Sequence, residues 1–220
     1  MAVGPHSWGI FAFINGSLIK VADHNTAIPD SWHNFMALEQ AQISGQNLVF
    51  YNWYHDPIDE GIYALLNGSL VTIADSGMPD PSGFGEFLNF NHRPSISGEN
   101  IAFIADTTQG RRSIYLYNNN SLNSYIEPNV IYHGYPKILE YINEPVIISG
   151  KNLVFSYDGI FAFYDGMLLK IIEPGSLLDN KLIKGIRYGS NSFDENKIAF
   201  HASFDDGSEG IYVAQIAPTI

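Results

Sequence analysis

The sequence predicts an all-β protein, a β-propeller of about four four-stranded blades with an extra terminal strand, and three observations support this prediction. A unit of about fifty residues recurs along the chain. Each unit carries hairpin turns at matching places, and no segment sustains a helical period. Blades of a propeller are small sheets that bury their faces against their neighbours, and a repeat of this length suits that packing.

The clearest mark of the repeat is a Gly-Ile-aromatic step. It occurs at Gly9-Ile10-Phe11, Gly61-Ile62-Tyr63, Gly159-Ile160-Phe161 and Gly210-Ile211-Tyr212, with Ser113-Ile114-Tyr115 as a variant, at intervals of 52, 52, 46 and 51 residues. A two-residue turn follows at Asn15-Gly16, Asn67-Gly68, Asn119-Asn120 and Asp165-Gly166. Asn-Gly and Asp-Gly accept a positive φ at both central positions, so these turns predict type I′ hairpins.

The remaining pieces of each unit follow in a fixed order. A Ser-Leu strand comes next, as at 17–23 and 69–75, and then a longer loop. After the loop, a strand ends in a Ser-Gly turn at Ser44-Gly45, Ser97-Gly98 and Ser149-Gly150. An apolar run closes the unit at 47–50, 100–103, 152–155 and 197–200. One unit therefore holds four short strands.

Three pieces of the chain, Pro94-Ser95-Ile96-Ser97-Gly98, Ile101-Ala102-Phe103 and Ile114-Tyr115, resemble in order the β-propeller repeats of the TolB and WD40-like class. The Trp of that class and its Pro-Asp before the turn glycine are missing here. The resemblance implies a fold and no activity, since propellers host unrelated functions. It also implies strand names: A before the Ser-Gly turn, B after it, C at the Gly-Ile step and D at the Ser-Leu strand.

On this basis we expect one domain over residues 1–220. The repeats run approximately over 1–34, 35–86, 87–136, 137–184 and 185–220, the last being partial and closing with the N-terminal segment. Seventeen strands are expected, from a C strand at 10–14 to a C strand at 211–216. If strand D at 17–23 completes the last blade, Trp8–Phe13 is surplus, although a fifth partial blade fits equally. An unpaired strand edge invites another chain, which predicts a homo-oligomer.

The composition limits the classes of partner that the protein can bind. The chain carries 23 acidic against 11 basic residues, a formal net charge of −12, which repels phosphate backbones and anionic lipid. We therefore expect no nucleic-acid and no membrane partner. The absence of cysteine excludes disulfides and zinc sites that use thiolates. No apolar run is long enough to span a bilayer. The compartment stays unknown, with a secreted or extracellular location favoured.

The long loops between strands D and A and between B and C are the expected place for function, because loops on a rigid scaffold carry function more often than the scaffold. Aromatic and imidazole side chains with a flat face and a polar tip suit a glycan or small-molecule ligand. The alternative is that they pack between blades. The candidate ligand-binding residues are Trp32, His33, Trp53, His55, Tyr132, His133 and Arg187.

Strand A offers a second candidate site. Six residues before each Ser-Gly turn glycine stand Glu39, His92 and Glu144. Ionisable groups are costly to bury unless paired, so equivalent positions near a narrow axis suggest an acid–base cluster with shifted pKa values. In an enzyme these three would be the catalytic residues. The alternative, which we favour, is a water-filled channel lined with polar side chains.

No motif for metal, phosphate or dinucleotide binding is found, so no cofactor and no metal site is expected. The acidic loops at 56–60 and 205–209 admit Ca²⁺ as a minor alternative to solvated turn charge. The leading hypothesis is a ligand-binding propeller, possible ligands being carbohydrates in a lectin-like site or other small molecules. The alternatives are an enzyme of the glycosidase, lyase or cyclase/isomerase type, and an extracellular structural or assembly protein.

Overall fold

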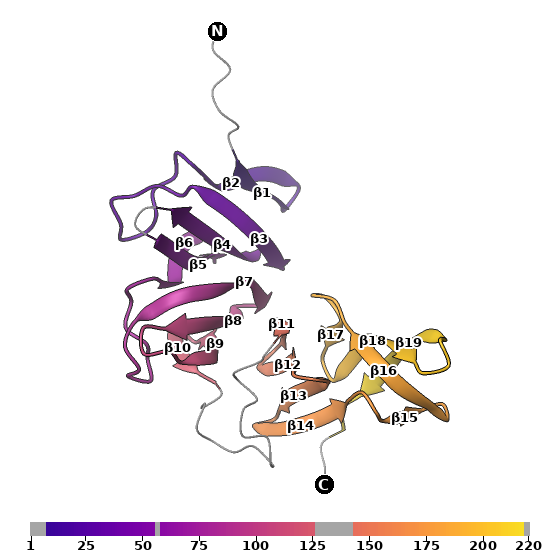
Figure 1. Ribbon diagram of the computed structural model, residues 1–220. Coiled ribbons are helices and arrows are strands. Elements are labelled where there is room, and N and C mark those ends of the chain that lie inside the picture. Colours follow the sequence, from indigo (N-terminus) through magenta and orange to yellow (C-terminus); the bar gives the residue numbers. More distant parts are fainter. Residues whose placement is uncertain (1–7, 56–57, 126–142, 218–220) are drawn as a thin grey trace. The chain divides into compact units, whose positions relative to one another are not determined.

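The computed structural model describes residues 8–55, 58–125 and 143–217 (Figure 1). The chain divides into two compact units, Met1–Tyr125 and Ile126–Ile220. All helix and strand elements assigned in the described ranges are β-strands. No helix there is long and apolar enough to cross a membrane. The two units are therefore described in turn as sets of antiparallel sheets.

The N-terminal unit contains one two-stranded and two four-stranded sheets. Neighbouring strands are consecutive in the chain and antiparallel, so each sheet is a simple meander. The strands are β1 (Gly9–Ile14) and β2 (Ser17–Asp23); β3 (Ala37–Ser44), β4 (Asn47–His55), β5 (Ile58–Leu66) and β6 (Ser69–Asp75); and β7 (Phe87–Ser97), β8 (Asn100–Thr107), β9 (Arg112–Asn118) and β10 (Ser121–Ser124).

The C-terminal unit contains a third four-stranded meander and a sheet of five strands. The meander is formed by β11 (Asn143–Ser149), β12 (Asn152–Ser156), β13 (Ile160–Tyr164) and β14 (Met167–Ile172). The last sheet is formed by β15 (Leu177–Leu178), β16 (Lys181–Arg187), β17 (Phe193–Asp194), β18 (Lys197–Phe204) and β19 (Glu209–Gln215). Its order is β15-β16-β18-β17, and β19 pairs with the other edge of β18.

These sheets confirm the predicted fold class: the protein is all-β, and its four-stranded antiparallel meanders are propeller blades. The extra terminal strand is β1. It pairs with β2 in a two-stranded sheet, and the turn at Asn15-Gly16 joins the two strands as a hairpin. The expected closure of the last blade by residues 17–23 stays a prediction.

The last sheet differs from the expected pattern by two short strands, β15 and β17. Strand A is split there, since β16 and β17 both pair with β18 and an irregular segment separates them. β15 and β16 form a hairpin across Asp179-Asn180, where both residues have a positive φ. This turn has the predicted chemistry of a type I′ hairpin, but it lies outside the repeat pattern.

The predicted type I′ turns are confirmed at all four places. Asn15 and Gly16 have φ angles of 52° and 78°, and the equivalent pairs after β5, β9 and β13 are likewise positive at both positions. The Ser-Gly turns differ, because only their glycine, such as Gly45 at 62°, has a positive φ. A positive φ at the first loop residue alone is typical of a type II′ hairpin.

The Ser-Gly turns also join adjacent sheets. The Ser44 Oγ accepts a hydrogen bond from the backbone N–H of Gly98 in the next sheet. The Asn47 side chain donates to the Gly98 carbonyl and accepts from the N–H of Asn67 in its own sheet. In the C-terminal unit, the Ser149 Oγ accepts from the N–H of Glu195 in the same way. The repeated serine and asparagine are thus structural.

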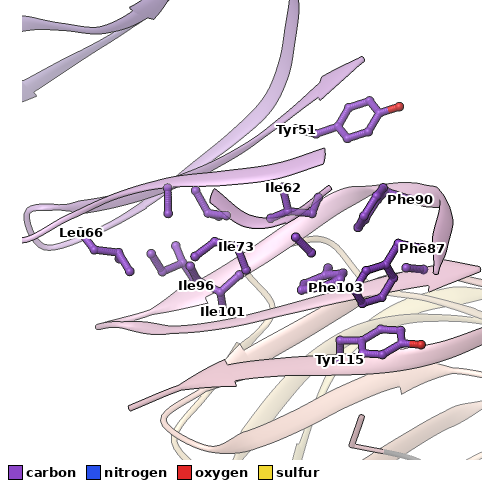
Figure 2. Close-up of a cluster of buried hydrophobic side chains, with 14 residues drawn as sticks. Tyr51, Ile62, Leu66, Ile73, Phe87, Phe90, Ile96, Ile101, Phe103 and Tyr115 are labelled. Carbon is purple, nitrogen blue, oxygen red and sulfur yellow. The ribbon is translucent and has the colours of Figure 1, made fainter. Parts of the chain in front are cut away.

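The Gly-Ile-aromatic step places the isoleucine and the aromatic residue on opposite faces of the sheet, because side chains alternate along a strand. We call these the isoleucine face and the aromatic face. Ile62 of β5 packs towards the next sheet, in one buried cluster with Phe103 and Tyr115 (Figure 2). Each isoleucine face therefore packs on the aromatic face of the following sheet within the unit.

The glycine of this step has a packing role. The ring of the aromatic residue two positions later folds back over it, so that a Cβ built on Gly61 would lie 2.7 Å from the ring of Tyr63. At Gly210 the distance to the Tyr212 ring would be 2.8 Å. Any side chain at these positions has to displace the ring, which explains the residue type that recurs there.

Candidate functional site

The loop between β2 and β3, residues 24–36, forms a candidate site in the N-terminal unit. The Ile28 N–H donates to the His33 carbonyl, and the Phe35 N–H donates to the Thr26 carbonyl. Phe35 is fully buried beneath the loop, where its ring meets those of Phe50 and Tyr63. The loop is therefore anchored to the blade from below while its tip stays open.

A cavity of about 450 Å³ lies along this loop. Trp32 is 89% exposed, and its ring centroid lies 3.6 Å from that of His33. The cavity offers a broad aromatic surface next to imidazole and amide groups that can hydrogen-bond. Its lining consists of His24, Ile28, Trp32, His33, Asn34, Phe35 and Met36.

The loop between β6 and β7, residues 76–86, has equivalent backbone hydrogen bonds but a different content. The Asp80 N–H donates to the Gly85 carbonyl, as the Ile28 N–H does to His33 in the first loop. Phe84 takes the place of Trp32. The Arg111 guanidinium lies 4.2 Å from the centre of the Phe84 ring and 4.0 Å from the Asp80 carboxylate.

This buried ion pair was missed by sequence reasoning. Asp80 and Arg111 are both almost fully buried, and the Arg111 side chain also donates to the Ser124 Oγ. Burial, followed by the negative charge of Asp80, raises the pKa of the Tyr115 phenol. Here the aromatic ring of the loop is covered by a cation of the protein itself, whereas Trp32 in the first loop is open to solvent.

A second group of polar side chains lies on the sheet β3–β6. The Trp53 indole N–H donates to the Glu39 carboxylate at 3.3 Å, and the Glu60 carboxylate accepts the backbone N–H of Phe90 at 2.9 Å. Tyr51 is buried near both carboxylates. Burial, followed by the charge of Glu60, raises the pKa of the Tyr51 phenol, so it stays protonated at neutral pH.

The other predicted residues are distributed as follows. Arg187 lines a smaller hollow of about 260 Å³ on the C-terminal sheet, together with Tyr188, His201 and Ile211. His92 lies on β7, Glu144 on β11 and His55 on β4, but their side chains are outside the described part of the chain. Tyr132 and His133 lie entirely outside the described residues.

The structure therefore brings Trp32 and His33 together at one cavity and Trp53 to Glu39. It does not place the other predicted side chains in either group. Trp53 is half-buried against the core rather than on the wall of the Trp32 cavity. Within the described ranges, no three His, Cys, Asp or Glu side chains are close enough to hold a metal ion. In the acidic loop 205–209, Asp206 is paired with Lys181 and Ser208.

Comparisons with known proteins show no family and no activity for this chain. No protein-family model matches the chain, and no curated protein matches it in sequence. Among solved structures it is similar to the β-propeller domain of the Trilobed protease from Pyrococcus furiosus, which has an open velcro topology. The identity is 11% and the TM-score 0.47, over 79% of this chain and 48% of that one, so this chain spans about half its length. Membership of the TolB class stays a prediction.

Proposed function

We propose that the protein is a ligand-binding propeller whose site is the cavity of the loop 24–36. The ligand class is a carbohydrate or another small molecule that combines a flat apolar face with hydroxyl or amide groups. The observation that carries the proposal is the Trp32 ring, which lies on the wall of a cavity with most of its surface exposed to solvent. Large exposed aromatics at a concave site are typical of ligand contact.

Size and chemistry agree with this ligand class. The volume of about 450 Å³ lies within the range of roughly 300–1,000 Å³ that is typical of small-molecule pockets. Trp32 supplies the face on which a sugar or flat ring can stack. His24 and Asn34 supply hydrogen-bonding groups, and Ile28 and Phe35 form an apolar floor. The ordered backbone bonds of the loop lower the entropic cost of binding.

The loop 76–86, which has equivalent backbone hydrogen bonds, provides an internal comparison. There Phe84, which replaces Trp32, is covered by Arg111, and Asp80 occupies the position of Ile28. The Phe84 ring thus contacts a side chain of the protein itself. This contrast supports a single ligand site rather than several equivalent ones, as expected from loops that differ between blades.

The test is a panel of glycans and small aromatic metabolites, screened by thermal shift, because a ligand that binds only the folded state raises the melting temperature. Binding of each hit is then followed by tryptophan fluorescence in a Trp8→Phe/Trp53→Phe variant, in which Trp32 is the remaining tryptophan of the three. We expect a spectral change on binding in this variant, and we expect Trp32→Ala in the natural background to lose the thermal shift.

The matched control is Trp8→Ala, which removes an exposed tryptophan outside the cavity lining. This variant should bind like the natural protein. A panel without any hit, or a hit that binds equally well to Trp32→Ala, contradicts the proposal.

The same hits test the enzyme alternative. The observation in its favour is that Glu39 and Glu60 lie near the buried Tyr51 phenol, and carboxylates in unlike environments can divide acid and base roles. An enzyme of the glycosidase, lyase or isomerase type would turn over a hit, and Glu39→Gln would abolish turnover. A binding module leaves the ligand chemically unchanged and binds it in Glu39→Gln as well.

A further inference from the structure

The packing between sheets follows one rule within both units. The isoleucine face of the β1–β2 hairpin, with Ile10 and Ala12, is buried with Phe50 and Tyr63 of the following sheet. The sheet β3–β6 packs in the same way on β7–β10. In the C-terminal unit, Ile160 of β13 shares a buried cluster with Phe200 of the last sheet. Each of these interfaces therefore joins an isoleucine face to an aromatic face.

The β1–β2 hairpin exposes an aromatic face. Phe11 and Phe13 are 57% and 70% exposed, and Leu18, which pairs with Phe13 across the hairpin, is also exposed. Their counterpart Tyr63 in β5 is 2% exposed. The other side of the hairpin is buried, so its exposure is confined to one face.

The C-terminal sheet exposes the opposite kind of face. Ile211 and Val213 of β19 are 74% and 65% exposed, whereas Ile62 and Ala64, which hold these positions in β5, are fully buried. The hollow of about 260 Å³ lies on this same face, because Ile211 and its cross-strand partner His201 both line it. The exposed isoleucine face is therefore a concave apolar surface.

We propose that these two faces bind each other between copies of the chain, so that the protein self-associates head to tail. The described residues include one exposed aromatic face, on β1–β2, and one exposed isoleucine face, on β19, and these are the two kinds of surface that pair at the interfaces within each unit. Phe11 and Phe13 of one copy then cover Ile211 and Val213 of another. A contact between two different surfaces is heterologous, and it extends to rings or open chains.

The strand pairing favours face-to-face stacking of the two sheets over their joining into a single blade. β1 already pairs with β2, and β19 already pairs with β18, each in the position of strand C. The two cannot both be the third strand of one four-stranded blade. They can stack face to face, as neighbouring sheets do within each unit. Arg187 in the hollow can then lie over an incoming phenylalanine ring, a contact that favours a cationic guanidinium.

The self-association rests on other residues than the proposed ligand site, so the two proposals can fail separately. The experiment uses two variants of the full chain, Phe13→Lys and Val213→Lys, each of which places a charge on one face. Both positions are largely exposed, so the substitutions leave the core intact. Circular dichroism and melting temperature check the fold, and Phe13→Ser and Val213→Ser replace any variant that fails this check.

Molar mass is measured by light scattering after size exclusion over a wide range of protein concentration. The natural chain should form species larger than a monomer, and each variant alone should be monomeric. A one-to-one mixture of the two variants should form a heterodimer and nothing larger, because only one intact face of each kind remains. The control Ile43→Lys, which charges an exposed isoleucine on β3, should associate like the natural chain.

A natural chain that is monomeric at all concentrations overturns the proposal. Self-association that survives in both variants overturns it as well. A mixture that stays monomeric while the natural chain associates excludes the head-to-tail geometry. Recovery of the heterodimer is the outcome that only complementary faces on different copies produce.

Discussion

Replacement of Gly61 by alanine tests why a glycine precedes each aromatic residue of strand C. The new Cβ would lie 2.7 Å from the Tyr63 ring, whereas ordinary contact begins at 3.4 Å, so ring and strand must separate by about 0.7 Å. Tyr63 is buried and meets Phe35 at 4.9 Å and Phe50 at 5.9 Å between ring centres. The ring therefore has no free space into which it can move.

The expected cost follows from these contacts. Overpacking of a buried site destabilises by about 1–3 kcal/mol, and the lower chain entropy of alanine returns roughly 0.5–1 kcal/mol. Gly61 has no positive φ, so alanine adds no backbone strain. The free energy of unfolding should fall by about 1–2 kcal/mol in total.

Urea denaturation of Gly61→Ala, Tyr63→Ala and the double variant measures the coupling between the two positions. Once the ring is gone, alanine at position 61 should be neutral or slightly stabilising. An equal loss in both backgrounds would refute the steric reasoning. Ser113 already shows that a side chain can stand at the equivalent place, where the Tyr115 phenol lies beside Asp80.

Three further predictions concern polar groups. Asp80→Ala leaves the Arg111 charge buried and should cost about 3–5 kcal/mol in urea denaturation, most of it recovered in Asp80→Ala/Arg111→Met. Asn47→Ala removes two hydrogen bonds at a buried turn and should cost about 1–3 kcal/mol, whereas Asn123→Ala at an exposed site should not change the melting temperature. Hydrogen bonds from Ser208, followed by Lys181, lower the pKa of Asp206 to about 2, so Ser208→Ala should raise it more than Lys181→Met in an NMR titration. Because the folded pKa lies below the unfolded value of 3.8, this contribution to stability is present above that pH and is lost as pH falls towards 2, and the opposite trend would contradict it.

The sequence was sufficient to predict the blades because their turns depend on local chemistry. An Asn-Gly pair adopts a positive φ at both positions wherever it stands, and the alternation of apolar residues defines the two faces of each strand. The split strand A of the last sheet was not predictable in this way. Asp194-Glu195 stands where the other units carry Ser-Gly, and without that signal the pairing of β17 depends on tertiary contacts.

Only part of the candidate site could be predicted from the sequence. Trp32 and His33 were predicted as binding residues because two flat side chains with polar tips stand together in a long loop. The structure places both on a cavity wall. The ion pair of Asp80 and Arg111 carried no signal, since thirty residues separate the partners and neither belongs to a motif. Likewise, nothing in the sequence pairs Glu60 with the N–H of Phe90 in another sheet.

Because each sheet contacts mainly the next one, we expect local stability to differ between the ends of a unit and its interior. In such arrays stability is close to a sum of repeat and neighbour terms, so opening begins where a neighbour is missing. The β1–β2 hairpin has a packed sheet on one side, whereas β4 and β8 lie deep in blades with buried faces. Amide protons of the hairpin should exchange with solvent before those of β8, and any partner that covers Phe13 would slow exchange there first.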